Sequence, residues 1–285
     1  AIIDKLTENI YVTAAVSILI TVALASVLGR TLSRPIHRLV AGMNKVRAGD
    51  LDVEVEPTTR DEIGLVTSSF NQMLVGLRER LHLMKYVGTH TIDMIQSSSG
   101  EKVALGGSRR ELAVLFSDIR GFTSYSERRS PEEVISMLNR YLGFQAEIVP
   151  DFDGSIDKFV GDEMVALFTG DDALERAIGC AVAIQRRVSR EHEIDPVPID
   201  VGIGVNYGPV ILGNMGAESR LDYTVIGADV NLCSRLCAVA GPGQILIPCH
   251  LLERLDPPPQ VRRTQMMTFK GVSNQLEVAE IGSDG

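Results

Sequence analysis

The sequence has no excess of basic residues, since 28 Lys and Arg stand against 37 Asp and Glu for a formal net charge of −9. This balance argues against a broad basic face, so we expect no nucleic-acid partner. Cysteine is also scarce. The four cysteines lack the CxxC spacing of zinc and redox sites, which predicts free thiols in a reducing compartment: they are Cys180, Cys233, Cys237 and Cys249.

The stretch from Ile10 to Leu28 lacks charge altogether and approaches the roughly 20 residues that cross a bilayer as a helix. A buried core helix is the alternative, but such a helix seldom stays apolar all round. We therefore predict a transmembrane helix within residues 1–29 that contacts membrane lipid. Asp4 and Glu8 precede it and no small-residue cleavage pattern follows, which argues against a signal peptide.

Basic residues precede the next acid, Asp50: they are Arg30, Arg34, Arg38, Lys45 and Arg47. By the positive-inside bias, they place the rest of the chain in the cytoplasm, which predicts a protein of the inner cell membrane. The sequence begins at Ala1 without Met. We expect a fragment whose upstream sensor domain is missing. The sequence therefore reveals neither the stimulus nor whether that stimulus activates or inhibits.

Two helical patterns follow the apolar stretch, separated by a polar connector. The first begins at Pro35 and places on one face Ile36, Leu39, Val40, Met43 and Val46. The second repeats as an a/d seam, with a stutter between Leu77 and Leu81: its earlier members are Ile63, Val66, Phe70 and Met73. A plain helical hairpin packed on a globular domain is one interpretation of this pair.

The order of helix, connector, "DEIG" from Asp61 to Gly64, and second helix resembles the HAMP linker of bacterial transmembrane receptors. The resemblance covers residues 30–81 and rests on Pro35, Glu62 and Gly64. It implies a parallel homodimeric four-helix bundle that relays a conformational change from the membrane to an effector domain.

After a coupling segment over 82–105, a globular domain is predicted over 106–285. A buried strand, "ELAVLFSDI", precedes a helix that begins at Ser130 and Pro131. Two strands joined at Gly161 and Asp162, a helix from about Asp172 and another strand follow. Strand, helix, hairpin, helix, strand is the split βαβ order of a ferredoxin-like fold, which predicts the α+β class with an antiparallel sheet.

Two aspartates are candidate metal ligands. Asp118 ends the first strand, and Phe122 and Thr123 then begin a helix whose free N–H groups can receive phosphate oxygens. Alone, Asp118 could be an N-cap acid, and Asp162 could belong to an ordinary hairpin turn. In a split βαβ sheet, however, the first strand lies beside the hairpin. The converging carboxylates then suit two Mg²⁺ or Mn²⁺ ions that hold a triphosphate, and oxygen ligands accept both metals.

Three stretches, "FSDIRGFT", "DKFVGDEMVALF" and "DYTVIGADVNLCSRL", are together similar to the catalytic domain of class III nucleotidyl cyclases. The likeness runs from about Gly107 to the C-terminus. It implies head-to-tail homodimers with shared active sites at the interface, where ATP or GTP is cyclised with release of pyrophosphate.

The resemblance also implies roles for single residues. Asp118, Asp162 and the Ile119 carbonyl are the expected metal ligands, and Lys158 and Thr224 the expected purine readers. Asn231 and Arg235 are expected to position the ribose and stabilise the transition state. Lys270, in "TFKG", is expected to contact phosphate, although the sequence after it lacks an expected proline.

Donors and acceptors distinguish the purines. Adenine has an acceptor at N1 and donors at N6, whereas guanine has a donor at N1 and an acceptor at O6. Lys158 can only donate and the Thr224 hydroxyl can accept, so this pair favours ATP. We therefore predict an adenylate cyclase that forms 3′,5′-cyclic AMP. A guanylate cyclase, or an inactive cyclase fold that serves as a signalling relay, is the alternative.

Overall fold

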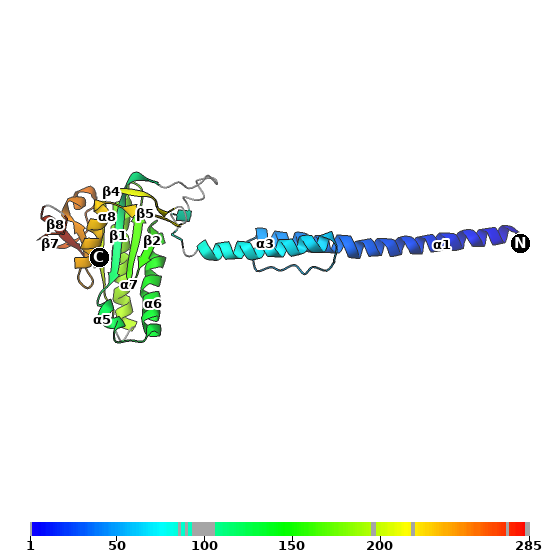
Figure 1. Ribbon diagram of the computed structural model, residues 1–285, viewed down its shortest axis with the longest axis horizontal. Helices are drawn as coiled ribbons and strands as arrows, with labels where there is room; N and C mark the ends of the chain where they lie inside the picture. The colour runs from blue at the N-terminus through cyan, green and yellow to red at the C-terminus, as the bar shows by residue number, and fades with distance from the viewer. Residues whose placement is uncertain are drawn as a thin grey trace. The chain divides into compact units, whose positions relative to one another are not determined.

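The structure is a computed structural model that describes residues 2–84, 87–88, 91–92, 106–194, 198–217, 220–271 and 274–282. Contacts divide the chain into two units, Ala1–Tyr86 and Val87–Gly285, and each is described by itself (Figure 1). Most of the coupling segment predicted over 82–105 falls outside the described residues.

A long N-terminal helix opens the first unit. Helix α1 (Ile2–Leu28) continues through a π-helical turn, η1 (Gly29–Ser33), into α2 (Arg34–Arg47). Pro35 lies in the first turn of α2, as expected, but the backbone is already helical before it, so α2 continues from α1 and η1 instead of following a loop. Proline lacks an N–H and crowds the carbonyl one turn earlier, and we attribute the wider π turn to this crowding. The stretch Asn9–Arg47 is long and apolar enough to cross a membrane.

The "DEIG" segment fixes the start of α3 (Glu62–Met84). The Asp61 Oδ1 atom accepts hydrogen bonds from the N–H groups of Ile63 and Gly64, at 3.1 and 3.2 Å. A Cβ added to Gly64 would lie 2.0 Å from the Thr59 carbonyl oxygen. The acid therefore caps the helix, and the glycine lets the connector pass close to it.

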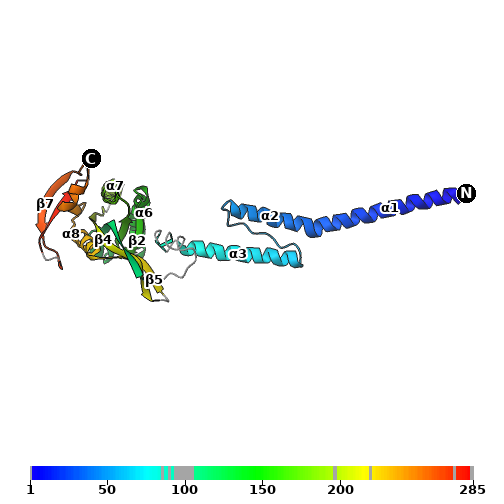
Figure 2. The same ribbon diagram turned by 90° about the horizontal axis from the view of Figure 1, so that it is seen from above.

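Helices α2 and α3 run side by side in the same direction, and the connector returns along them (Figure 2). Their small shared core contains Leu39, Val55, Phe70 and Leu74. Within α3 the buried residues are Gly64, Thr67, Phe70 and Leu74. Of the residues predicted for the a/d seam, only Phe70 is among them. Val66 and Met73, by contrast, are 50% and 58% exposed.

The second unit contains an eight-stranded sheet in the order β2-β3-β1-β4-β6-β8-β7, with β5 paired to β4. Its elements are β1 (Gly106–Ile119), α5 (Phe122–Ser126), α6 (Pro131–Asp151), β2 (Ser155–Val160), β3 (Glu163–Phe168), α7 (Ala173–Ile194), β4 (Val201–Ala217), β5 (Arg220–Ile226), α8 (Ala228–Val239), β6 (Ile245–Pro248), η2 (Cys249–Arg254), β7 (Val261–Met267) and β8 (Leu276–Ile281).

The predicted ferredoxin-like order is confirmed by β1, α6, β2, β3, α7 and β4. The expectation of a wholly antiparallel sheet is wrong at one pair, because β4 and β6 are parallel. Helix α8 intervenes between these strands, and such a crossover is what parallel pairing needs. Strands β6, β7 and β8 were not predicted.

Local sequence signals explain two boundaries. At the start of α6, Ser130 Oγ accepts from the Glu133 N–H at 3.3 Å, and the Glu133 carboxylate accepts from the Ser130 N–H at 2.9 Å, forming a capping box. At the hairpin between β2 and β3, Gly161 has a φ of +64°, which glycine adopts without a Cβ penalty.

The central sheet has a core on each face. One core joins α6 and α7 to side chains such as Leu115 on β1. The other joins α8 to the alternating residues of the same strand, such as Val114 and Phe116. Because successive strand residues point to opposite faces, β1 contributes to both cores.

Helix α8 approaches β4 unusually closely because glycines face it. A Cβ added to Gly204 would lie 2.5 Å from the Cys237 nitrogen and 2.6 Å from the Cys233 carbonyl oxygen. A Cβ on Gly202 would lie 2.7 Å from the Ala240 carbonyl oxygen, and one on Gly208 2.6 Å from the Asp229 carboxylate carbon. The glycines of "VGIGVNYG" at 202, 204 and 208, separated by even numbers of residues, thus lie on one face of β4 and let the helix backbone approach.

We predict that Gly204→Ala lowers the free energy of unfolding by about 1–3 kcal/mol, because the new methyl group forces α8 away from β4. Thermal unfolding of the full chain measures the effect. The matched control is Gly143→Ala in α6, where an added Cβ meets nothing within 4 Å and which should be neutral or mildly stabilising. Equal melting temperatures for the two variants would contradict the close packing of α8 against β4.

Candidate functional site

The two predicted metal-ligand aspartates converge at one end of the sheet. Asp118, near the end of β1, pairs with Glu163 at the start of β3. Asp162 occupies the hairpin turn directly before Glu163 and lies within hydrogen-bond reach of the Asp118 carboxyl. The predicted proximity of β1 and the hairpin is therefore correct, and Glu163 adds a third acid that sequence reasoning missed.

Arg120 is the counterion of the acid cluster, which consists of Asp118, Asp162 and Glu163. Its Nη2 atom bonds Asp118 Oδ2, and its Nη1 atom donates to the carbonyl oxygens of Ala240 at 3.2 Å and Ala238 at 3.4 Å. The backbone N–H of Arg120 also donates to the Asp200 carbonyl oxygen at 2.8 Å. The arginine thereby connects the acid cluster with the last turn of α8. Its place in "SDIRGF" was the available signal, and sequence reasoning did not use it.

The acid cluster is electrostatically strained. Burial raises the pKa of Asp118 to about 6, Arg120 opposes this rise, and the neighbouring Asp162 adds to it. Burial likewise raises the pKa of Glu163 to about 7, with further contributions from Asp118 and Asp162. Among the described residues, no group of three His, Cys, Asp or Glu side chains is arranged to hold a metal ion. A cation bound here would need oxygen ligands from outside these side chains.

The predicted phosphate-binding segment begins directly after this cluster. Gly121, with a φ of +72°, precedes α5, whose first residues are Phe122 and Thr123. Phe122 packs against the main core, whereas Thr123 is exposed. Ile119 is buried at 2% exposure and pairs with Val201. The helix start is thus anchored beside the acids.

Lys158 and Thr224, the predicted purine readers, lie around a shared carboxylate. The Thr224 hydroxyl donates to Asp157 Oδ2 at 2.8 Å, and Lys158 Nζ lies 3.6 Å from the same oxygen. Lys158 Nζ also bonds Asp222 Oδ2 at 3.1 Å. The structure thus places Lys158 and Thr224 close together, while their role as purine readers stays a prediction. Asp157 and Asp222 were missed, although Asp157 precedes Lys158 directly.

Asn231 and Arg235 lie one turn apart on α8. The Asn231 N–H donates to the Gly227 carbonyl oxygen at 3.1 Å in the first turn, and the Asn231 side chain is exposed. A Cβ added to Gly271 would lie 3.4 Å from Arg235 Nη2, so the turn containing Lys270 approaches the guanidinium. The described contacts thus form three groups: the acid cluster, the Lys158 and Thr224 pair, and Arg235 beside the Lys270 turn.

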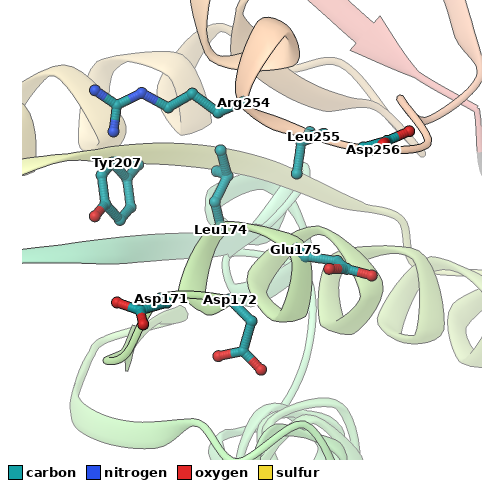
Figure 3. A pocket seen from close by; sticks show the side chains of 8 residues that line it. All are labelled: Asp171, Asp172, Leu174, Glu175, Tyr207, Arg254, Leu255 and Asp256. Atoms are coloured by element: carbon teal, nitrogen blue, oxygen red, sulfur yellow. The ribbon is translucent and has the colours of Figure 1, made fainter.

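A pocket of about 430 Å³ lies elsewhere, between the start of α7 and η2 (Figure 3). Its charged lining consists of Asp171, Asp172, Glu175, Asp256 and Arg254. The Arg254 guanidinium stacks over the Tyr207 ring at 5.1 Å. Because carboxylates dominate the lining, the pocket is unsuited to a triphosphate, and none of the predicted site residues lines it.

Comparison with known families identifies the class of both parts of the chain. Residues 107–278 match the family described as the adenylate and guanylate cyclase catalytic domain, and residues 27–79 match the HAMP domain. The fold and the matches define a HAMP-linked nucleotidyl cyclase domain. Because the cyclase match spans more than half of the sequence, the chain belongs to the adenylate and guanylate cyclase family, which confirms the resemblance seen in its motifs.

Curated relatives include proteins of several bacteria. An adenylate cyclase of Anabaena cylindrica is 34% identical over 227 residues, which cover 73% of this chain and 45% of the relative. An uncharacterised protein of Mycobacterium tuberculosis is 31% identical over 245 residues, which cover 84% of this chain and 46% of the relative. The chain therefore spans less than half the length of these relatives.

Solved structures support the fold. The guanylyl cyclase Cya2 is 36% identical with a TM-score of 0.59, and the match covers 62% of this chain and 94% of that one. The adenylyl cyclase CyaB from P. aeruginosa is 31% identical with a TM-score of 0.58, covering 62% and 96%. Similar structures thus include cyclases named for either purine, which leaves the choice of base to the site residues.

The raised pKa values predict how stability depends on pH without divalent cations. Because the folded state favours the protonated forms of Asp118 and Glu163, their contribution is present below the ordinary carboxyl pKa values near 4 and is lost as pH rises through about 6 to 7. Asp118→Asn and Glu163→Gln should each lose less thermal stability between pH 4.5 and 8 than the wild type.

The control is Asp153→Asn, which removes an exposed acid. It should keep the wild-type pH dependence of the melting temperature. Parallel melting curves for all of the variants would show that the acid cluster is not strained in solution.

Proposed function

We propose that the chain is the effector end of a membrane-anchored adenylate cyclase that converts ATP to 3′,5′-cyclic AMP and pyrophosphate. The observation that carries this proposal is the convergence of Asp118 and Asp162 beside the start of α5, in a chain of the cyclase family. The other site groups suit the remaining parts of ATP.

The acid cluster fits a pair of divalent cations. Its donors are hard carboxylate oxygens. Burial is the main cause of the raised pKa of Asp118 and the neighbouring Asp162 adds to it, and bound cations would relieve this repulsion between carboxylates. Asp118, Asp162 and the Ile119 carbonyl would hold Mg²⁺ or Mn²⁺. Such ions, when bound, polarise the α-phosphate, favour ionisation of the 3′-hydroxyl and neutralise the leaving pyrophosphate.

The cationic residues stabilise charge that develops on the phosphates. Arg235 presents a guanidinium on α8 beside the Lys270 turn, so both can face phosphate oxygens of one nucleotide. Asn231 lies one turn earlier on α8, where its amide can hold the ribose. The N–H groups of Phe122 and Thr123 are proposed to receive phosphate oxygens beside the acids.

Adenine is the preferred base in this proposal. The Lys158 ammonium donates to N1, and the Thr224 hydroxyl accepts from the N6 amino group. Guanine would present a donor to the ammonium and an acceptor to the hydroxyl, and a buried donor or acceptor that is left unpaired costs about 1–3 kcal/mol. The named relatives do not decide between the purines, so the donor pattern is the main support.

A homodimer completes the site. Several apolar strand residues are 38–53% exposed in the single chain: Phe159, Val160, Ile211, Leu221 and Ile226. Exposed apolar surface of this kind is typical of an interaction face. We propose that two copies pair through it, so that the acid cluster of one faces the Asn231 and Arg235 side chains of the other.

Regulation is proposed to pass through the HAMP domain. Helix α1 would cross the inner membrane, the basic residues after it would keep the cyclase domain in the cytoplasm, and α2 and α3 would form a parallel four-helix bundle with a second copy. The exposed Val66 and Met73 supply apolar surface for that bundle. Small changes in helix phase would then alter the alignment of two shared active sites.

We predict that the purified protein forms cyclic AMP from ATP with Mn²⁺, and that Asp118→Ala and Asp162→Ala each lower turnover about 100-fold or more. Both variants should stay folded, because the removed carboxylates repel one another. Chromatography of the product and circular dichroism measure the two effects.

The matched control is Asp171→Ala in the acidic pocket, which should keep wild-type turnover. If the wild type forms cyclic GMP in preference, the adenylate assignment is wrong. If it forms neither product under conditions where the protein is folded and dimeric, the inactive relay replaces the enzyme.

A further inference from the structure

The purine-reading pair is organised by a third side chain, Asp157, whose side chain is only 2% exposed. Asp157 Oδ2 accepts the Thr224 hydroxyl at 2.8 Å, and Thr224 itself is 8% exposed. The same oxygen lies 3.6 Å from Lys158 Nζ. Asp157 is therefore a buried carboxylate that touches both residues proposed to read the base.

An irregularity in β2 determines on which side of the sheet the Asp157 side chain lies. The register between β2 and β3 shifts between Ile156 and Lys158, which is where a β-bulge inserts an extra residue. Ile156 packs toward the main core. Without the extra residue, strand alternation would send Asp157 and Lys158 to opposite faces of the sheet, whereas a bulge allows neighbouring side chains to share a side. The short distance between the two side chains agrees with this.

The hydrogen bond to Asp157 limits what the Thr224 hydroxyl can offer a ligand. An ionised carboxylate can only accept, whereas a threonine hydroxyl has one proton to donate and lone pairs that accept. Because Thr224 donates its proton to Asp157, only its lone pairs remain for a ligand. A hydroxyl that could otherwise donate or accept is thereby restricted to accepting.

We propose that Asp157 is a positioning residue that sets base specificity, by holding Thr224 as an obligate acceptor for the 6-amino group of adenine. This inference rests on the proposed adenylate cyclase function and extends it. The N6 group of adenine donates, whereas the O6 atom of guanine and hypoxanthine accepts. A 6-oxopurine would therefore place its O6 acceptor against the Thr224 hydroxyl, which can also only accept. Any mismatch at Lys158 adds to this one.

Asp222 does not share this role. Its side chain is 69% exposed and bonds Lys158 at 3.1 Å, so it acts on the ammonium from the solvent side. Lys158 donates with or without this contact, since an ammonium has no lone pair. Only Asp157 changes what the site can present to the 6-position.

The experiment compares kcat/KM for ATP and for inosine triphosphate, which carries hypoxanthine, in the full chain with Mn²⁺. We expect Asp157→Asn to lower the ATP to inosine triphosphate ratio about tenfold or more, because an amide can donate to Thr224 and free its proton for O6. Asp157→Leu, which removes the acceptor without a new donor, should lower the ratio as well. It serves as the second variant if the first does not fold.

The control Asp153→Asn removes an acid at an exposed site just before β2 and should keep the wild-type ratio. A double-mutant cycle identifies the route of the effect. In a Thr224→Val background, Asp157→Asn should change the ratio no further, because the hydroxyl that it orients is absent. A further drop in that background would mean that Asp157 acts through Lys158 instead, which contradicts the proposal.

The outcomes separate this inference from the proposed function. If the wild type prefers ATP but folded, active Asp157 variants keep its ratio, the role of Asp157 is wrong while the adenylate cyclase stands. If the wild type prefers GTP or inosine triphosphate, the adenylate assignment itself fails.

Discussion

The close contact between α8 and the glycine positions of β4 is the constraint on which the proposed active site depends. The single S–H donor of Cys233 lies between the Val114 and Gly204 carbonyl oxygens, at 3.0 and 3.2 Å from the sulfur, so the helix contacts two strands. Asn206 donates to the Asp229 carbonyl oxygen at 3.0 Å near the start of α8. Because both the middle and the start of the helix are held, the positions of Asn231 and Arg235 follow from the strand sequence.

Charge compensation is the second organising feature of the domain. Arg120 neutralises part of the acid cluster and also holds the carbonyls that end α8, so a cation entering beside Asp118 must compete with a residue that supports the helix. Around Lys158 the signs are reversed, since Asp157 and Asp222 surround an ammonium. The acid cluster and the Lys158 group thus each carry a counterion, which lowers the cost of burying their charges.

Much of this arrangement could be predicted from the sequence where local rules govern it. Asp118 and Asp162 were predictable because strand order alone brings β1 beside the hairpin, and Ser130 because a capping box is local. Features that arise from tertiary structure were missed. The bulge that turns Asp157 inward leaves no mark in "DKFVGD", and the contact of Arg120 with the end of α8 joins residues 120 positions apart. The parallel pairing of β4 and β6 likewise depends on a crossover rather than on periodicity.

The fixed position of α8 leads to the central claim that two chains build each active site. Arg235 lies beside the Gly271 turn of its own chain, whereas Arg120 connects Asp118 with the far end of α8. We propose that a second copy brings the two functions together. The most direct measurement mixes Asp118→Ala with Arg235→Ala, each inactive alone, and assays cyclic AMP formation. Random pairing should restore roughly a quarter of wild-type activity, through one intact site in each mixed dimer. A mixture as inactive as its parts, with exchange of subunits demonstrated, would show that each site is built within one chain.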